Sequence, residues 1–308
     1  MKKQLLSTSI ALLCLTTFNT HAVTYLSAKA MVDVEDGKLI KSPLITIDDG
    51  VITNIEQNKK PTLSKDDKHI QLPDLTLMPG LMDMHVHLTS DPTVPRSERL
   101  GQSVPRMAIK AAHFAKKTLE AGFTTVRNVG AEGYSVIAVR DGINAGDIAG
   151  PRIWAAGPSL GITGGHCDNN RLPPELKYTS SGVADGPWAA RIKVRENIKY
   201  GANAIKFCAT GGVFSKGTKV GAQQYSFEEM KAIVDEAHMR DLPVAAHAHG
   251  TSGIKTAIKA GVDSVEHASF LDNEAIALAK EHGTWLSMDI YNTEYTLTYG
   301  EQNGVDEE

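Results

Sequence analysis

The longer part of the chain, from Leu75 onward, repeats one pattern of polar and apolar stretches. A helical stretch is followed by a glycine and then by a short apolar run, most clearly at Gly122, Gly201, Gly261 and Gly283. Such a glycine supplies the left-handed backbone that a helix-to-strand loop needs. Continuous apolar runs are typical of parallel strands covered on both faces. The pattern predicts strands near residues 77–86, 123–129, 152–157, 203–208, 243–248, 262–267 and 284–290.

Seven strand–helix units in succession predict an α/β fold, a TIM-like (β/α)8 barrel that lacks its last unit. Residues 77–308 would form this barrel, incomplete at its C-terminal end. They number 308 − 76 = 232, slightly fewer than the roughly 250 of a typical barrel. A doubly wound open sheet is the competing fold and stays open at this point.

The preceding segment, residues 23–76, has the pattern of short β-strands. Asp36-Gly37 and Asp49-Gly50 are typical of hairpin turns, and residues 44–47 and 51–55 alternate apolar and polar positions. The segment is too small to be the whole protein. We predict the N-terminal part of a small composite β domain, of β-sandwich type, beside the barrel.

The first 22 residues have the composition of a secretory signal peptide. Lys2 and Lys3 precede an apolar run over residues 5–18, and Thr20-His21-Ala22 offers small residues for cleavage after Ala22. The run is too short for a stop-transfer helix. We therefore expect a secreted, periplasmic protein with no membrane attachment after cleavage; an uncleaved anchor is the alternative.

Composition excludes several classes of protein. With 42% hydrophobic and 22% charged residues the chain has an ordinary globular balance. It carries 32 basic and 36 acidic side chains, a net charge of −4, so there is no basic surface for nucleic acid. The expected partner is a small molecule or dipeptide, and a homo-oligomer is allowed.

The predicted strand ends carry the chemistry. In parallel α/β folds the functional groups collect at the carboxyl ends of the strands. Five of the 11 histidines fall there: His85, His87, His247, His249 and His267. The two imidazoles of a His-x-His strand point to the same face, where both can bind one metal ion. A solvent-facing pair is the bland alternative for His85 and His87 alone, but the later histidines favour a metal site.

Lys206 also lies at a predicted strand end, within an apolar run. Such a lysine is usually the buried partner of an acidic group. A charged ammonium beside a metal dication would be repelled, so a lysine within the cluster has to be neutral or covalently altered. A carbamylated lysine would provide a carboxylate that can bridge two metal ions.

Several of these segments together resemble the amidohydrolase superfamily, in particular its prolidase-like (Xaa-Pro or Xaa-Arg) dipeptidases and the imidazolonepropionase-like hydrolases. The resemblance covers about residues 24–290. It rests on the segments Met78-Pro-Gly-Leu-Met-Asp-Met-His-Val-His87, Lys206 running into Cys208-Ala-Thr-Gly-Gly212, His247-Ala-His-Gly250 and Val265-Glu-His267.

The resemblance implies a role for each residue. His85 and His87 would bind a first divalent metal ion, His247 and His267 a second, and Lys206 as a carbamate would bridge them; zinc suits these ligands. The implied reaction is hydrolysis of an amide-type C–N bond, in a dipeptide or similar small amide, by metal-activated water. His166 is a candidate for contact with the substrate or the oxyanion, and His249 and Tyr225 are further pocket candidates. A loop histidine and a surface tyrosine are the bland alternatives for His166 and Tyr225.

Two departures from the family pattern qualify this expectation. An aspartate at the end of an eighth strand, which binds metal and moves the proton, has no counterpart, and we do not expect Asp289 to replace it. Asn128 stands where relatives commonly have aspartate. The alternative is therefore a catalytically inactive metal-binding or interaction protein.

Two further features of the sequence, a serine-hydrolase-like motif and a pair of cysteines, are weaker signals of function. Gly157-Pro-Ser159-Leu-Gly161 matches the nucleophile elbow of serine hydrolases, but loop residues follow instead of the required helix. Cys167 and Cys208 both fall near the strand-end edge, where a disulfide or two buried thiols would fit.

Overall fold

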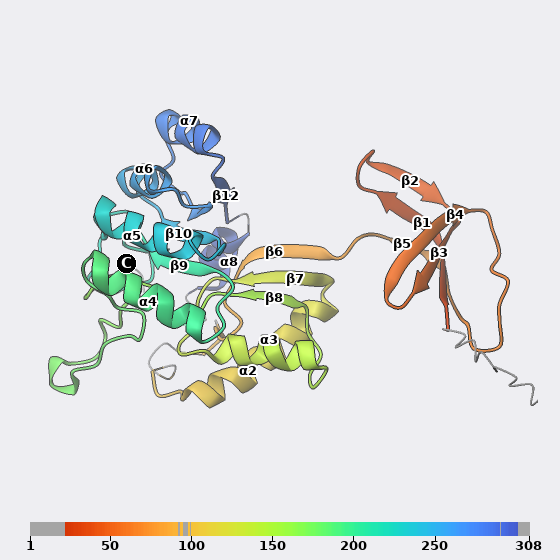
Figure 1. The fold of residues 1–308 in the computed structure, drawn as a ribbon, viewed down its shortest axis with the longest axis horizontal. Coiled ribbons are helices and arrows are strands. Elements are labelled where there is room, and N and C mark those ends of the chain that lie inside the picture. Colours follow the sequence, from red (N-terminus) through yellow and green to blue (C-terminus); the bar gives the residue numbers. More distant parts are fainter. Residues whose placement is uncertain (1–21, 92, 95–97, 99, 290, 301–308) are drawn as a thin grey trace, which may run out of the picture. The chain divides into compact units, whose positions relative to one another are not determined.

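The structure is a computed structural model that describes residues 22–91, 93–94, 98, 100–289 and 291–300 (Figure 1). The chain divides after Pro79 into two compact units, and each is described by itself. The predicted signal peptide, apart from Ala22, lies outside the described residues. Within those residues no helix combines the length and the apolar character that crossing a bilayer would require.

The first unit is a β-sheet of five strands. They are β1 (Thr24–Asp33), β2 (Lys38–Lys41), β3 (Pro43–Asp48), β4 (Val51–Gln57) and β5 (Lys68–Leu77). The long strand β1 pairs antiparallel with β2 and β3 and parallel with β5, and β4 pairs with β3. The predicted hairpin turn at Asp49-Gly50 is confirmed: it joins β3 to β4, and both residues have positive φ. The described residues of this unit form one sheet, so the second sheet of the predicted β-sandwich stays a prediction.

The second unit contains the seven predicted strands, all parallel to their neighbours. They are β6 (Leu81–Val86), β7 (Phe123–Asn128), β8 (Arg152–Ala155), β9 (Ile205–Cys208), β10 (Val244–Ala248), β11 (Ser264–His267) and β12 (Trp285–Ser287). Strands β6-β7-β8 and β9-β10-β11-β12 follow in sequence order, and a parallel bridge between Ala156 and Ala204 connects the two groups. The predicted order and direction of the strands are confirmed.

The strands curl into a barrel wall instead of lying in an open sheet. Arg127 on β7 donates a hydrogen bond to Ser264 on β11, with an N–O distance of 2.8 Å. Four strand spacings separate β7 from β11, which in a flat sheet would be about 19 Å at roughly 4.8 Å per strand. Only a strongly curved arrangement brings these two side chains together, so the TIM-like fold is favoured over the doubly wound alternative.

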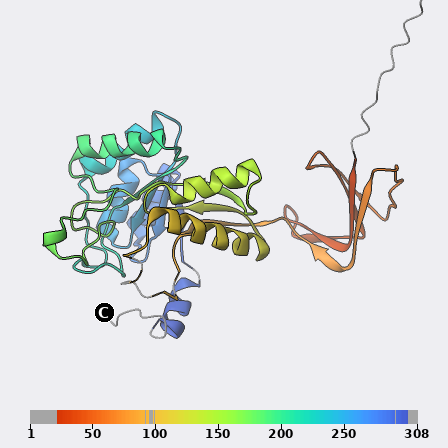
Figure 2. The same ribbon diagram turned by 90° about the horizontal axis from the view of Figure 1, so that it is seen from below.

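Helices form an outer layer around this wall, as Figures 1 and 2 show. They are α2 (Val104–Glu120), α3 (Ser135–Ala145), α4 (Pro187–Lys199), α5 (Phe227–His238), α6 (Thr251–Ala260) and α7 (Asn273–His282). A further helix, α8 (Asn292–Tyr299), follows β12, and a short 3-10 helix spans Pro174–Leu176. The four predicted loop glycines have positive φ, between 69° and 98°. Strands β9 and β10 are buried along their whole length, so Lys206 and His247 are both shielded from solvent.

Candidate active site

The predicted cluster of histidines assembles at the carboxyl end of the barrel strands. His85 lies near the end of β6 and His87 just beyond it, while His247 and His267 lie on β10 and β11. The ring centroid of His267 is 4.8 Å from that of His85 and 4.7 Å from that of His247. The ring centroids of His85 and His87 are 5.4 Å apart. Residues more than 180 positions apart in the sequence thus share one site.

Three of these histidines have the spacing of a metal-binding group. One ring nitrogen each of His247, His249 and His267 lies within 4.8 Å of the others. The sequence placed His249 in the substrate pocket, whereas the geometry also makes it a potential ligand. His267 has a φ of 71°, in the left-handed region. That conformation costs a non-glycine residue about 1–3 kcal/mol and is typical of functional sites.

His247 shows that this group suits a metal ion. Its Nε2 atom is the one buried side-chain polar atom among the described residues that has no hydrogen-bond partner. An orphaned polar atom of this kind costs about 1–3 kcal/mol when nothing compensates it. Burial lowers the pKa of His247 well below its usual value. The result is a neutral imidazole with an unused lone pair, the form that binds metal ions.

The neighbouring histidines are neutral for the same reason. Burial lowers the pKa of His87 to about 3 and that of His249 to about 4, and it also lowers the pKa of His85. The ring of His87 is oriented by the carbonyl oxygen of Gly130, which lies 2.9 Å from its Nδ1 atom. A carbonyl can only accept, so Nδ1 carries the proton and Nε2 presents its lone pair.

Lys206 is buried on β9: 3% of the surface of the residue is exposed to solvent. Burial lowers its pKa to about 8, with a further contribution in the same direction from the charge of Arg127. The carboxylates of Glu266 and Asp289 oppose that shift. The neutral amine that the sequence argument required is therefore accessible near neutral pH.

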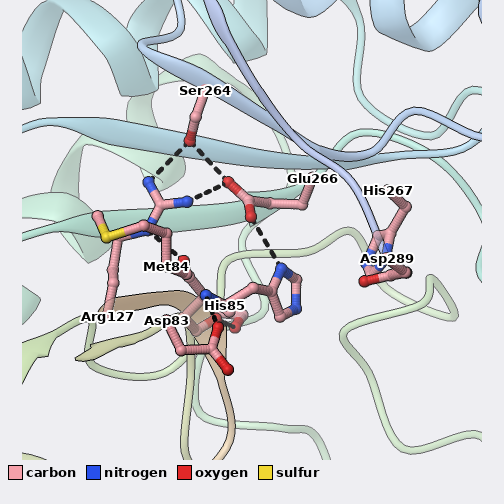
Figure 3. A network of polar contacts seen from close by, with 10 residues as sticks. Asp83, Met84, His85, Arg127, Ser264, Glu266, His267 and Asp289 are labelled. Carbon is pink, nitrogen blue, oxygen red and sulfur yellow. Dashed lines mark hydrogen bonds and ion pairs between the residues drawn. The ribbon is translucent and has the colours of Figure 1, made fainter. Parts of the chain in front are cut away.

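A buried ionic network lies beside His85 (Figure 3). Glu266 on β11 accepts hydrogen bonds from Arg127 at 2.6 Å and from the hydroxyl of Ser264 at 2.6 Å. Its other oxygen lies 2.8 Å from Nδ1 of His85. Neither Glu266 nor Arg127 was predicted from the sequence as a site residue. The sequence does carry a signal for them: each is a charged residue within a predicted buried strand, and a buried charge requires a partner.

His166 lies against the cluster on a loop held by a disulfide. Its ring stacks on that of His247 with the centroids 4.1 Å apart, and its Nδ1 shares a hydrogen bond with the hydroxyl of Ser215. The next residue, Cys167, forms a disulfide with Cys208 at the end of β9. The sequence left a disulfide and two buried thiols open; the structure shows the disulfide. It ties the His166 loop to the strand that carries Lys206.

Tyr225 lies in the hydrophobic core. It is fully buried, and its hydroxyl donates to the carbonyl oxygen of Ala184 at 2.9 Å. The surface position considered from the sequence is wrong. Because the hydroxyl is committed to the backbone, this arrangement gives no support to a place for Tyr225 in the substrate pocket.

Asp289 contacts the cluster directly, and Asn128 is linked to it through the backbone of Gly130. Asp289, just beyond β12, lies 2.5 Å from Nδ1 of His267. Asn128 is fully buried: its Oδ1 accepts from the backbone N–H of Leu88 at 2.8 Å, and its Nδ2 donates to the carbonyl of Gly130 at 3.1 Å. That carbonyl is the one that orients His87. An ionised aspartate could not donate a hydrogen bond to this carbonyl. The structure thus explains why an asparagine suits position 128.

The chain is similar to several known proteins. Residues 76–306 match the model of the amidohydrolase family. Ochratoxinase from Aspergillus niger is 34% identical over 270 residues, which cover 80% of this chain and 55% of that protein. The chain thus spans about half the length of this curated relative.

Solved structures are similar over most of the chain. A Xaa-Pro dipeptidase with methionine bound in its active site has 36% identity and a TM-score of 0.79, with 92% of this chain and 70% of that one covered. A prolidase in complex with N-methylphosphonate-L-proline has 30% identity and a TM-score of 0.83, with the same coverage. The family match, together with these relatives, shows that the chain belongs to the amidohydrolase family, among its prolidase-like members.

Proposed function

We propose that this protein is a metal-dependent amidohydrolase that hydrolyses the C–N bond of a dipeptide or similar small amide. The observation that carries the proposal is the orphaned Nε2 of His247 within a compact group of histidines at the strand ends. Burial without a partner is costly for that nitrogen, and a bound cation removes the cost.

The proposed ligands are His85 and His87 for one divalent ion and His247 and His267 for a second, with zinc as the metal that imidazole suits. His249 is a further ligand candidate, because its ring nitrogen belongs to the compact group of three. When bound, the metal would act as a Lewis acid and lower the pKa of a bound water molecule. We also propose that Lys206 carries the bridging carbamate; its buried, neutral amine is the form that reacts with carbon dioxide.

His166 is proposed to contact the carbonyl group of the substrate. Its ring lies on that of His247, and its hydrogen bond with Ser215 restrains the ring plane. The disulfide at Cys167 restrains the backbone at the next position. A group held in this way can orient a substrate carbonyl without reorganising during the reaction.

The proposed substrate class draws on the relatives. A Xaa-Pro dipeptidase and a prolidase are among the similar solved structures, and both names denote cleavage of a peptide-type C–N bond. Dipeptides ending in proline are therefore the first substrates to examine.

Metal content and turnover of the purified protein test the proposal. Elemental analysis of protein prepared without chelator should find close to two divalent ions per chain, and a panel of Xaa-Pro dipeptides should be cleaved. His247→Ala should lose metal and turnover together. His238→Ala, on helix α5 with a surface partner in Asp263, is the matched control and should retain both. A folded protein with almost no metal would contradict the proposal. Full metal content without turnover would favour the alternative of a metal-binding protein that does not catalyse.

A further inference from the structure

Glu266 is held in a clamp formed with Arg127 and Ser264. The carboxylate is fully buried, and Arg127 and Ser264 both donate to its Oε1 atom at 2.6 Å. Arg127 also donates from its Nε atom to the carbonyl oxygen of Met84 at 2.7 Å. The guanidinium therefore connects the carboxylate to the backbone beside His85, as Figure 3 shows.

The second carboxylate oxygen of Glu266 faces His85. Oε2 lies 2.8 Å from Nδ1 of the imidazole. An ionised carboxylate only accepts hydrogen bonds, so Nδ1 must carry the proton. The lone pair of His85 is then on Nε2, the nitrogen on the far side of the ring from the clamp. The ring orientation and the tautomer are both fixed by one contact.

Two other histidines of the cluster follow the same rule. Nδ1 of His87 faces the carbonyl of Gly130, and Nδ1 of His267 faces the carboxylate of Asp289. In each case an acceptor from another part of the barrel receives a hydrogen bond from Nδ1. Among these three, His85 is the one whose acceptor is itself fixed by an arginine.

We propose that Glu266 is a positioning residue for the metal centre: clamped by Arg127 and Ser264, it holds His85 in the tautomer that presents Nε2 to the metal. This inference rests on the proposed metal-dependent function and assigns Glu266 a part in it. The proposed role does not make the carboxylate a metal ligand, because both of its oxygens have protein partners. Its effect passes through His85.

Glu266→Gln separates this role from simple packing. The glutamine has almost the same shape, but one of its two polar atoms is a donor. Arg127 requires an acceptor, so the amide oxygen should turn to Arg127 and the amide nitrogen to His85. Nδ1 of His85 would then have to accept, and its proton would move to Nε2, where it blocks metal binding.

Glu236 offers a matched control. It is also a buried glutamate held by arginines, with Arg195 at 2.8 Å and Arg191 at 3.3 Å. It lies on helix α5, and none of its partners among the described residues is a histidine. Glu236→Gln removes the same charge from a similar environment. Any general effect of losing a buried carboxylate should appear in both variants.

Two measurements on the full chain decide the question. Nitrogen-15 NMR of labelled histidines, in metal-free protein and with His85 assigned through His85→Gln, should show an Nδ1 proton in the unaltered protein and in Glu236→Gln. It should show an Nε2 proton in Glu266→Gln. Competition with a chelator should show zinc affinity reduced about 10- to 100-fold in Glu266→Gln and unchanged in Glu236→Gln.

An Nε2 proton on His85 in the unaltered protein would overturn the inference, whether or not the variant folds. So would equal zinc affinity in the two glutamine variants. Failure of the proposed function looks different: the unaltered protein would then bind no zinc, while the NMR spectrum would still report on the clamp.

Discussion

The ring of His166 stacks on the ring of His247, with the centroids 4.1 Å apart and the planes inclined by 24°. One residue comes from a long loop and the other from the buried strand β10. The stack places the loop against the ring of His247, which we propose as a metal ligand. Because His166 is proposed to contact the substrate and is not among the proposed metal ligands, displacing it should affect catalysis more than metal content.

Gly212→Ala is the change that tests this separation. A Cβ atom at Gly212 would lie 2.3 to 2.7 Å from three ring atoms of His166, so the ring would have to move. A misplacement of about 1 Å can cost roughly 100-fold in rate. We expect kcat/KM for a cleaved dipeptide to fall at least about tenfold, with metal content unchanged.

Gly142→Ala, in helix α3, is the control. Its Cβ would make ordinary contacts with Ile148, at 3.5 Å and beyond. Alanine also favours the helix, so activity should be retained. If Gly212→Ala has the same kcat/KM as this control, His166 does not act in the reaction.

Reduction of the Cys167–Cys208 disulfide should destabilise the protein and loosen the His166 loop. The bond joins residues 41 positions apart, and a disulfide closing such a loop contributes about 2–4 kcal/mol. We expect a lower Tm after reduction, measured by calorimetry, together with a lower kcat/KM. The double variant Cys167→Ala/Cys208→Ala should match the reduced protein and should not respond to reductant. A Tm that reduction leaves unchanged would contradict this account.

Lys206→Ala should remove the proposed bridge between the metal sites. Lys206 is buried, and it lies close enough to His85, His87 and His247 for its charge to lower their pKa values. Alanine offers neither an amine nor a carbamate. We expect turnover to be abolished and metal per chain to fall by at least one ion, while the protein stays soluble.

Lys255→Ala provides the comparison, because this lysine pairs with Asp272 and Glu274 on the outer helices. Surface pairs of this kind contribute about 0–1 kcal/mol, and metal content should not change. Turnover retained by Lys206→Ala would refute its place in the centre.

The positions of the metal-ligand candidates follow from the sequence because two simple periodicities determine them. His85 and His87 share a face because strand side chains alternate. His247 and His267 join them because parallel strands end at one edge. Neither argument needs the packing of distant side chains.

The supporting residues do not follow in this way. Arg127 contacts Glu266 only because the barrel wall is strongly curved. No local pattern of residues in the sequence encodes the degree of that curvature. Tyr225 shows the same limit, since its aromatic ring and hydroxyl suit a surface, a pocket and a core equally well. Its hydroxyl is satisfied by the carbonyl of Ala184, a partner 41 residues away.

Glu236 should make the stability of the fold sensitive to acid. Hydrogen bonds from Arg195, then from Arg240 and Arg191, lower the pKa of this buried carboxyl from 4.5 to about 2. The unfolded chain binds a proton at this position near pH 4.5, whereas the folded protein resists it. The stabilisation is therefore complete above pH 4.5 and is lost as the pH falls towards 2.

Urea unfolding of the unaltered protein and of Glu236→Gln between pH 6 and pH 2.5 measures this contribution. At about 1.4 kcal/mol per pKa unit, the difference in unfolding free energy should shrink by up to about 3 kcal/mol as the pH falls. The buried histidines also destabilise the fold in acid, because they must remain neutral. They are present in both proteins and cancel in the difference. A difference that stays constant across this range would show that the three arginines do not hold Glu236 ionised.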